Sequence, residues 1–420
     1  MNKERKQFMK TCKPMLRVLA GVLIFACIAT AADAPKHKII TFDAPGAGTG
    51  SGQGTVPETI NPAGKITGFT RDANLVRHGF LRDKHGNFTV FDDPNAGTGS
   101  GQGTRAYTIN PKGEIEGYYT DSSNVAHGYV RDPHGTITNF DAPDAGTGAG
   151  QGTFPWCLDC LNRAGAVTGW YVDSNNGTHG FLRAPDGTIT EFDVPGDSGG
   201  TVPYGGINAA GTITGYYVDA SNAWHGFLRS SKGHFTTFSV SGAYYTAAES
   251  INAAGATTGW WADANFDAYH GFVRDPHGKI TRFDPPGAGK DNGQGTVPWS
   301  INDAGVISGQ YQDTNGVYHG FVRDPHGKIT TYDVPDAGTG SGQGTQPNVI
   351  NNPGAVTGDY IDAGGVYHGF LAKGFSDLEY SDILPEAGGT FNDQGPINGQ
   401  GATTAVPGAT TRRPSATLPE

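Results

Sequence analysis

Hydrophobic residues in this chain come in short runs that fit β-strands. In one representative stretch, the runs VISGQYQD (306–313), YHGFVRD (318–324) and KITTYD (328–333) are separated by turns rich in glycine, asparagine and proline. A fourth run ends just before them, at Ile301-Asn302. Short apolar runs joined by such turns predict an antiparallel meander of four strands. After residue 34 no long stretch has apolar residues at helical spacing, which argues against helices.

The same pattern is repeated seven times along the chain. Each copy has an Ile-Asn or Leu-Asn pair, an aspartate 11 residues after that asparagine, and a His-Gly-Phe or His-Gly-Tyr triplet that begins six residues later, or seven in one copy. The repeat asparagines are Asn61, Asn110, Asn162, Asn208, Asn252, Asn302 and Asn351. The aspartates and histidines are Asp72 and His78, Asp121 and His127, Asp173 and His179, Asp219 and His225, Asp263 and His270, Asp313 and His319, and Asp362 and His368. Another aspartate, or Ser239 in one copy, follows each of the first six histidines by 14 residues.

Seven successive copies of a four-stranded meander predict an all-β fold: a seven-bladed β-propeller of four-stranded antiparallel blades that spans residues 37–374. The second strand of several copies is aromatic on both faces, as in Trp170-Tyr171, Tyr216-Tyr217 and Trp260-Trp261. A sheet exposed to water on one face would alternate more regularly between apolar and polar residues. We therefore expect each sheet to be packed between two neighbours.

The two ends of the repeat region predict how the ring closes. Residues 38–43 (KIITFD) look like a fourth strand without the other three, and the seventh copy has no obvious fourth strand after residue 374. We expect the N-terminal strand to complete the last blade, because a closed ring leaves no open sheet edges. An alternative fourth strand is residues 376–382, since Asp382 also follows His368 by 14 residues.

Glycine-rich segments such as FDAPGAGTGSGQGT (42–55) join the fourth strand of one copy to the first strand of the next. We call this recurring segment the glycine-rich loop. A phosphate-binding loop is excluded, because the glycines fall at every second position and neither a Lys-Ser/Thr pair nor a helix follows. The glycines suit a backbone that must cross a crowded rim and change direction.

Both ends of the chain differ from the repeats. Residues 1–31 have a basic front, a short apolar run and small residues before a cleavage position, which predicts a signal peptide and a secreted or periplasmic protein. Cys27 leaves a lipoprotein as an alternative. No second apolar segment predicts a membrane-spanning helix. Residues 375–420 are small, polar and proline-containing, which predicts a low-complexity, disordered tail.

The charge of the chain limits its partners. The net charge is −11, and removing residues 1–31 makes it five charges more negative, because that segment carries six basic residues and one acidic residue. Such an acidic chain argues against binding nucleic acid or anionic lipid by charge. The partner that we expect is a polysaccharide or a protein at the cell surface, bound by a monomer.

Cys157 and Cys160, in Cys-Leu-Asp-Cys, remain after the predicted signal peptide is removed. In an oxidising compartment this pair predicts a local disulfide. A metal site needs two further ligands, and no partner pair is visible; a redox role would favour a helix N-terminus. We therefore expect no cofactor, although recurring Asp-x-Asn turns leave calcium as an alternative.

The repeat histidines could be taken for catalytic groups, because each follows an aspartate with which it could form an acid–base pair. Seven copies cannot all be one active site. We therefore interpret the repeat histidines and aspartates as structural residues that hydrogen-bond to each other and pin each hairpin.

A binding site must break the sameness of the repeats, and several aromatic residues do so. They are Trp156, Tyr204, Trp224, Tyr244, Tyr245 and Trp299. They lie in or beside connections that strand alternation places on one face of the ring. Aromatic side chains there can stack on sugars or bind a partner, and ordinary packing between blades is the alternative.

Residues 300–333 resemble the bacterial extracellular HAF-repeat family, which is named for a His-Ala-Phe triplet and carries an Ile-Asn-x-x-Gly turn upstream. The resemblance covers about residues 37–374. This chain departs from it, because glycine, as at Gly79, replaces the alanine of the triplet, and the glycine-rich loop replaces a Leu-Gly-rich segment. The resemblance implies an exported, propeller-like repeat protein and passes on no catalytic residues.

These features predict a binding or cell-surface scaffold without catalytic activity. The alternative is a carbohydrate-active hydrolase or lyase that uses one propeller face. An asymmetric cluster of carboxylates or histidines at the central channel would favour that enzyme. A structural matrix protein would instead self-associate, and the fold alone does not choose among these functions.

Overall fold

The computed structural model of this chain describes residues 38–375. The predicted signal peptide at residues 1–31, the alternative fourth strand at 376–382 and the predicted tail beyond residue 375 lie outside the described residues. Between residues 38 and 375 the chain forms 28 β-strands. No helix in this range is long and apolar enough to cross a membrane.

The strands pair in consecutive antiparallel groups of four. In the first group, β2 (Gly54–Ile60), β3 (Ile66–Arg71), β4 (Arg77–Arg82) and β5 (Phe88–Phe91) pair in chain order. The groups that follow are β6 (Gly103–Ile109), β7 (Ile115–Thr120), β8 (Ala126–Arg131) and β9 (Ile137–Phe140); β10 (Gly152–Phe154), β11 (Val167–Val172), β12 (Thr178–Arg183) and β13 (Ile189–Phe192); β14 (Gly200–Val202), β15 (Ile213–Val218), β16 (Trp224–Arg229) and β17 (Phe235–Phe238); β18 (Tyr245–Ile251), β19 (Thr257–Ala262), β20 (His270–Arg274) and β21 (Ile280–Phe283); and β22 (Gly295–Ile301), β23 (Ile307–Gln312), β24 (Tyr318–Arg323) and β25 (Ile329–Tyr332). These are the meanders that the repeat predicts.

The last group takes its fourth strand from the other end of the chain. β26 (Gly344–Ile350), β27 (Val356–Ile361) and β28 (Tyr367–Lys373) pair in order, and β1 (Lys38–Phe42) then pairs antiparallel with β28. Asp43, just after β1, bonds to Nδ1 of His368 at 2.9 Å, in the place that a later aspartate takes in other copies. β1 therefore completes the last sheet, which is the pairing that the sequence favours.

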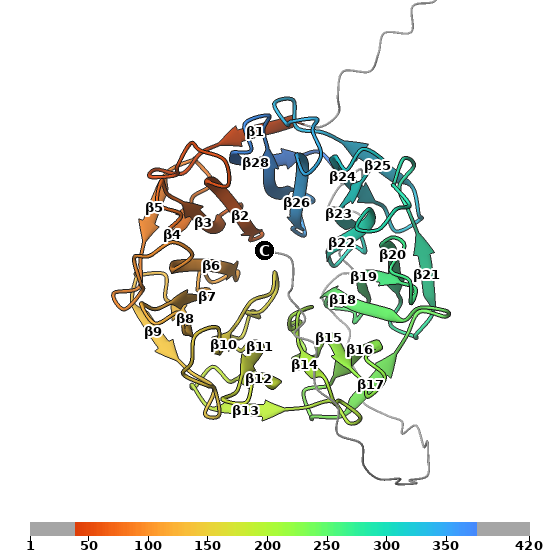
Figure 1. The fold of residues 1–420 in the computed structure, drawn as a ribbon, viewed down its shortest axis with the longest axis horizontal. Coiled ribbons are helices and arrows are strands. Elements are labelled where there is room, and N and C mark those ends of the chain that lie inside the picture. The colour runs from red at the N-terminus through yellow and green to blue at the C-terminus, as the bar shows by residue number, and fades with distance from the viewer. Residues whose placement is uncertain (1–37, 376–420) are drawn as a thin grey trace, which may run out of the picture. The chain divides into compact units, whose positions relative to one another are not determined.

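The sheets stand around a common centre and form a β-propeller (Figure 1). The first strand of each sheet lies nearest the centre, and the fourth strand, such as β5 or β9, lies on the outer rim. The aromatic residue of each His-Gly-Phe or His-Gly-Tyr triplet is fully buried, as at Phe80 and Tyr129. Side chains from neighbouring sheets thus share one packed core around the ring, as expected for sheets covered on both faces.

The repeat asparagines tie each sheet to the next. Oδ1 of Asn208 accepts hydrogen bonds from the backbone N–H groups of Ala210 and Thr212 and so closes its own turn, while Nδ2 donates to the carbonyl oxygen of Asn252 at 3.1 Å. The same donation runs from Asn61 to Asn110, Asn162, Asn208, Asn252, Asn302 and Asn351 and then back to Asn61, at 3.1–3.3 Å. We call this closed series of hydrogen bonds the asparagine circuit. All its members are buried, where a paired amide stabilises the fold and an unpaired one would be costly.

Close backbone approach explains the glycine at the end of each glycine-rich loop. Gly54 forms a one-residue parallel bridge with Tyr367 of the preceding sheet. Its φ is +125°, and a Cβ atom there would lie 2.0 Å from the Tyr367 carbonyl oxygen, so only glycine fits. Bridges of this kind join β2, β6, β10 and β26 to the preceding sheets and produce one 20-stranded sheet. Gly295, at the start of β22, makes the same kind of parallel bridge with Tyr269, just before β20. The loops that enter β14 and β18 lack the glycine-rich sequence, and within the described residues no such bridge joins these two strands to the preceding sheets.

A glutamine fixes the interior of the same loop. Oε1 of Gln53 accepts a hydrogen bond from the backbone N–H of Gly50 at 2.7 Å, and Nε2 donates to the carbonyl oxygen of Ala73 at 3.0 Å. A Cβ at Gly48 would lie 2.4 Å from Oε1 of Gln53. The alternating glycines therefore leave room for a glutamine that connects the loop to the neighbouring hairpin. From the sequence we expected only that the glycines let the backbone cross a crowded rim.

Replacing Asn208 by Asp tests the asparagine circuit. Asn208→Asp keeps Oδ1 but removes the Nδ2 donor and places a carboxylate against the buried carbonyl of Asn252. We expect the free energy of unfolding to fall by about 2–4 kcal/mol, measured by denaturant unfolding. The exposed Asn74→Asp is the matched control, and equal midpoints for the two variants would contradict a stabilising circuit.

Candidate functional site

A β-bulge interrupts the first strand of several sheets at the same position. The pairing shifts between Pro57 and Thr59 in β2 and leaves Glu58 without a partner in β3. The same shift leaves Tyr107, Glu249, Trp299 and Asn348 unpaired in β6, β18, β22 and β26. Bulges redirect side chains and are common beside functional sites. They single out one position in a repeat that is otherwise nearly uniform.

The two remaining first strands are shorter but place aromatic residues at the equivalent position. β10 and β14 end at Phe154 and Val202, and the following proline is succeeded by Trp156 and Tyr204. We call the complete set the bulge ring: Glu58, Tyr107, Trp156, Tyr204, Glu249, Trp299 and Asn348. Its members differ in chemistry from sheet to sheet, as a specific binding site in a symmetric scaffold requires.

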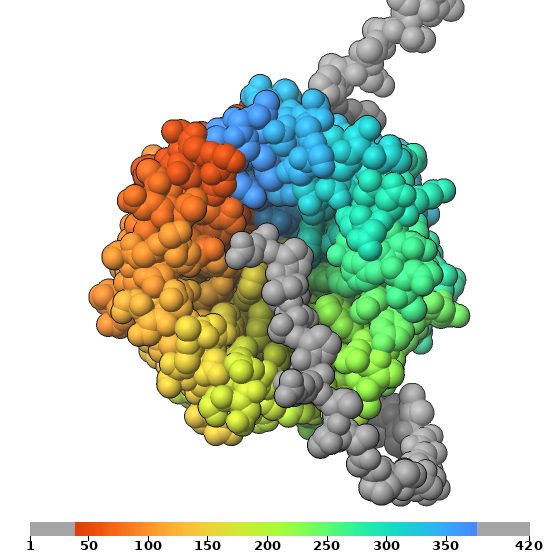
Figure 2. Space-filling view, viewed as in Figure 1, coloured from red at the N-terminus to blue at the C-terminus, as the bar shows by residue number. Residues whose placement is uncertain are grey.

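The bulge ring lies in, or directly after, the innermost strands of the propeller. The first strands are the innermost elements (Figure 1), and the space-filling view shows the ring hollowed at its centre (Figure 2). Trp156, Tyr204, Trp299 and Asn348 are partly exposed, whereas Glu58, Tyr107 and Glu249 are buried. A ligand in this central hollow would meet several partly exposed side chains of the bulge ring.

A disulfide-bonded loop crosses the inside of the propeller. Cys157 and Cys160 form a disulfide, and Thr108 of β6 hydrogen-bonds to the backbone of both. Between them, Asp159 accepts hydrogen bonds from the Ile207 backbone N–H and from Oγ of Ser250. Leu158 packs against the apolar cluster that holds Ile60 and Val349. The loop thus contacts sheets on several sides, near the ends of first strands that lead into the asparagine circuit, and forms a floor to the hollow.

One wall of the hollow is aromatic. The ring centroids of Trp156 and Trp170 are 5.8 Å apart, and Tyr204 lies 6.3 Å from Trp156 and 5.8 Å from Trp170. Farther along, Nε1 of Trp260 donates a hydrogen bond to Oε1 of Glu249 at 2.7 Å. Burial raises the pKa of Glu249 to about 8, against the lowering effect of that hydrogen bond. This wall therefore presents apolar ring faces beside a protonated carboxyl group.

The part of the site next to this wall is charged. Nη1 of Arg105 donates hydrogen bonds to the hydroxyl groups of Tyr118 at 2.7 Å and Tyr107 at 3.3 Å. Burial, with a smaller contribution from Asp359, raises the pKa of Glu58 to about 8, although Arg105 lowers it. Burial also raises the pKa of Asp359 to about 7. At neutral pH Glu58 is mostly protonated and Asp359 partly so, which makes both able to donate a hydrogen bond.

The six aromatic residues singled out from the sequence fall into two groups. Trp156, Tyr204 and Trp299 belong to the bulge ring. The others lie at strand starts or in the adjoining loop, on the face that carries the glycine-rich loops, which we call the glycine-loop face. Trp224 stacks on Tyr216 at 4.3 Å and contacts Tyr245 at 5.6 Å, and Tyr244 contacts Tyr245 at 4.9 Å. Of the six residues, four pack around one apolar cluster that includes Trp170 and Trp260; Tyr244 and Trp299 are the two exceptions.

The sequence interpretation missed the polar members of the site, which are Glu58, Arg105, Glu249 and Asp359. A signal for some of them was present, because the residue three positions before the repeat asparagine is Glu58, Tyr107, Glu249, Trp299 or Asn348 in five copies. Variation at one position among nearly identical repeats marks a place where the sheets are not interchangeable. Arg105 lies in the first strand β6 and Asp359 in the second strand β27, and the sequence interpretation singled out neither.

Six of the seven repeat histidines bridge two residues on the glycine-loop face, and His270 contacts Asp284 alone among them. Nδ1 of His78 lies 2.9 Å from Asp92, whereas Nε2 lies 3.7 Å from Asp72, the partner expected from the sequence. His225 differs, because Ser239 replaces the later aspartate and Asp219 approaches Nε2 to 3.0 Å. The closer partner is therefore usually the aspartate 14 residues later, on the fourth strand side of the same sheet.

The earlier aspartates also shape their own turns. Oδ1 of Asp313 accepts backbone hydrogen bonds from Asn315 at 2.8 Å and Val317 at 2.9 Å. These Asx turns account for the Asp-x-Asn pattern. Within residues 38–375 no group of three or more His, Cys, Asp or Glu side chains could hold a metal ion. Calcium binding stays a prediction.

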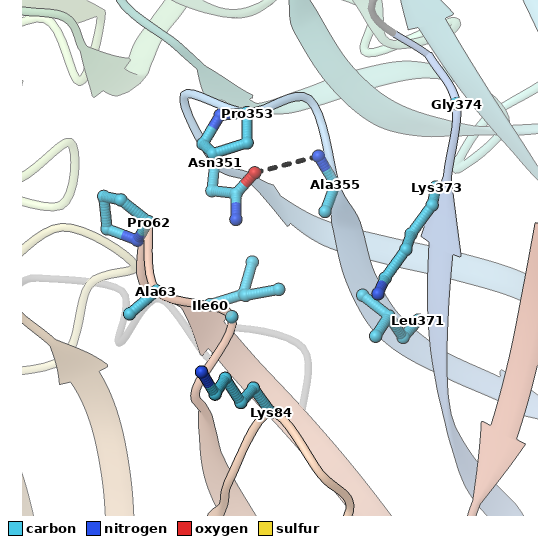
Figure 3. A pocket seen from close by; sticks show the side chains of 11 residues that line it. Ile60, Pro62, Ala63, Lys84, Asn351, Pro353, Ala355, Leu371, Lys373 and Gly374 are labelled. Carbon is cyan, nitrogen blue, oxygen red and sulfur yellow. Dashed lines mark hydrogen bonds between the residues drawn. The ribbon is translucent and has the colours of Figure 1, made fainter.

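A separate groove of about 410 Å³ lies at the asparagine circuit, between β2 and β28 (Figure 3). Ile60 and Leu371 line its apolar part, and the side chains of Lys84 and Lys373 border it. None of the aromatic residues singled out from the sequence lines this groove. It lies at the junction of the first and last sheets and is distinct from the central hollow.

Comparisons with known proteins give structural likenesses only. No family model and no curated relative matches the chain. Among solved structures, it is similar to TolB from Acinetobacter baumannii (12% identity, 74% of this chain and 63% of that chain, TM-score 0.41) and to a puromycin hydrolase (13%, 73% and 50%, TM-score 0.48). It is also similar to the BP39L lectin from Burkholderia pseudomallei (9%, 74% and 93%, TM-score 0.48). The chain spans about half to two thirds of the length of the first two, and at these scores the fold rests on the strand pairings described above.

The histidine bridges predict how stability depends on pH. The hydrogen bond to Asp141 raises the pKa of His127, and the bond to Asp284 raises that of His270. A histidine whose pKa is raised by folding stabilises the folded protein at pH values below its ordinary pKa of about 6.5. This contribution is lost as the pH rises through the raised pKa of the folded protein. Although burial opposes it, hydrogen bonding to His225 and Ser221 lowers the pKa of Asp219 to about 2, so this contribution is lost only as the pH falls below about 4.

We therefore expect the thermal unfolding midpoint to be highest at about pH 4–5 and to fall towards pH 9. The fall begins near the ordinary carboxyl pKa values of about 4, because Glu58 and Asp359 hold protons in the folded protein up to pKa values of about 8 and 7, and the histidine bridges add to it above about pH 6.5. Differential scanning calorimetry at pH 5, 7 and 9 measures this fall. It should be smaller in His127→Gln than in the exposed control His326→Gln. Stability that increases from pH 5 to pH 9 would show that the bridges do not hold protons.

Proposed function

We propose that this chain is an exported, seven-bladed β-propeller that binds a saccharide in its central hollow. The blade number is supported by the asparagine circuit, which passes through one asparagine of each sequence repeat and returns to the first. The disulfide between Cys157 and Cys160 supports export, because such bonds persist in oxidising compartments. The resemblance to the HAF-repeat family fits the same proposal.

The bulge ring is the observation that carries this proposal. It joins partly exposed aromatic faces, at Trp156, Tyr204 and Trp299, to hydrogen-bonding groups at Glu58 and Asn348. Sugars present both apolar ring faces and hydroxyl groups, so a site that combines aromatic faces with convergent polar groups suits them. A monomeric scaffold that holds a polysaccharide at the cell surface is the function that this arrangement supports best. The net charge of −11 does not favour nucleic acid as a partner.

A second candidate function, glycoside hydrolysis, is favoured by the carboxyl groups of Glu58 and Asp359. Burial, with a smaller contribution from Asp359, raises the pKa of Glu58 to about 8, and burial raises the pKa of Asp359 to about 7 although Arg71 lowers it. A protonated carboxyl beside an ionised one is the pattern of a general acid with a nucleophile or base. These two carboxyl groups are the observation that supports the alternative of a carbohydrate-active hydrolase.

Titration calorimetry with a panel of neutral and acidic oligosaccharides tests the binding function. We expect at least one to bind, and Trp156→Ala to weaken that binding about tenfold, because a sugar loses its stacking surface. Tyr244→Ala, in the loop group on the glycine-loop face, is the matched control and should bind normally. Circular dichroism checks that both variants fold. Equal affinity in the two variants, or no binding by the unchanged protein, would refute the site.

Product analysis in the same samples separates the two candidate functions. A scaffold leaves the bound oligosaccharide intact. Release of shorter saccharides that stops in Glu58→Gln, while binding persists, would establish the hydrolase instead.

A further inference from the structure

Three arginine side chains meet beside the charged part of the central hollow. Arg71 ends β3, Arg77 begins β4 and Arg105 lies in β6. The guanidinium carbons of Arg71 and Arg105 lie 5.7 and 5.5 Å from the centre of the same ring, that of Phe69. Nη1 of Arg77 donates to the carbonyl oxygen of Gly101 in the neighbouring glycine-rich loop. Three cationic groups are thus concentrated near the glycine-loop face of the first two sheets.

These arginines have little negative charge to balance them. In the part of the chain from residue 38 to residue 375, every ion pair within 4.0 Å is made by a histidine, so no carboxylate comes that close to Arg71, Arg77 or Arg105. The Nε atoms of all three are buried without a hydrogen-bond partner. The nearby carboxyls of Glu58 and Asp359 hold protons up to pKa values of about 8 and 7.

Arg77 is affected by the two other arginines. Burial and the charges of Arg105 and Arg71 together lower the pKa of Arg77 to about 10, against the opposing effect of the hydroxyls of Tyr118 and Tyr107. Buried charge of one sign is unfavourable unless a counter-charge accompanies it. An anion that enters the hollow would therefore gain more here than at an ordinary surface arginine.

The surroundings of Arg105 suggest which anion. Its guanidinium carbon lies 5.6 Å from the centre of the Trp156 ring, so the cationic group and an aromatic sugar-stacking face are neighbours. The planar guanidinium fork matches a carboxylate with two parallel hydrogen bonds. A six-membered sugar ring that carries a carboxylate would fit both groups at once.

We propose that the ligand is an acidic saccharide whose uronic acid carboxylate binds Arg71, Arg77 and Arg105 while its ring lies against Trp156. This inference rests on the proposed saccharide-binding function. Because the chain as a whole has a net charge of −11, general electrostatic attraction does not bring in a polyanion, and the selectivity must come from this local group of arginines.

Titration calorimetry with matched pairs of ligands tests the inference. The probes are oligogalacturonate, oligomannuronate and hyaluronate oligosaccharides, each beside its carboxyl-reduced, neutral counterpart. We expect at least one acidic form to bind the unchanged protein ten or more times more tightly than its reduced counterpart. Arg77→Gln should abolish that preference without weakening binding of the neutral form. Arg71→Lys keeps the charge but not the fork and should lose part of the preference, and Arg282→Gln, on an outer strand, is the control.

The failure of this inference can be told from the failure of the proposed function. Equal binding of acidic and reduced forms, or a preference that survives in folded Arg77→Gln and Arg71→Lys, overturns the inference and leaves saccharide binding standing. Tighter binding of a sulfated than of a carboxylated oligosaccharide also overturns it. Binding of neither form by the unchanged protein overturns both.

Discussion

Each repeat asparagine uses both ends of its side-chain amide, and the arrangement of the sheets depends on this. The oxygen closes the turn after the first strand, and the nitrogen donates to the next asparagine's backbone, so a local turn and a contact between sheets are made by one buried group. The last donation returns from Asn351 to Asn61. A four-stranded sheet of this length cannot bury both of its apolar faces alone, which means that the sheets become stable only beside their neighbours. β1 meets the same need at the outer edge of the last sheet, where it pairs with β28 as the fourth strand.

The features that follow from repetition were predictable from the sequence. The His-Gly-Phe spacing and the apolar second strands predict sheets packed on both faces, and KIITFD at residues 38–43 predicts the closing strand, because these patterns reflect local strand and turn chemistry. The closer histidine partner was not predictable in this way. Asp72 and Asp92 lie 6 and 14 residues from His78, and only the pairing of β4 with β5 decides that Asp92 is nearer.

The site was less predictable because long-range packing creates it. Trp156, Tyr204 and Trp299 could be singled out as aromatic exceptions. Their equivalence to Glu58 and Glu249, however, depends on the register of the first strands, through a bulge at Trp299 and through the early ends of β10 and β14. The Cys157–Cys160 loop is local in sequence, yet its contacts with Thr108 and Ser250 come from sheets on either side. The asymmetry of the site thus results from different residues at the bulge-ring position and from the Cys157–Cys160 loop, within a scaffold that is otherwise repeated. A nearly symmetric ring thus carries neighbouring aromatic and cationic side chains, such as Trp156 and Arg105, in only some of its sheets.

Closure of the ring by β1 is the central structural claim, and a disulfide trap measures it most directly. Ile40 and Leu371 face each other across β1 and β28, so the double variant Ile40→Cys, Leu371→Cys places two thiols on the same side of adjacent strands. The control Thr41→Cys, Leu371→Cys places them on opposite faces. The account predicts an intramolecular cross-link in the first variant only, seen by mass spectrometry as a peptide pair from the two ends of the propeller. No cross-link, or only cross-links between chains, would contradict a closed ring.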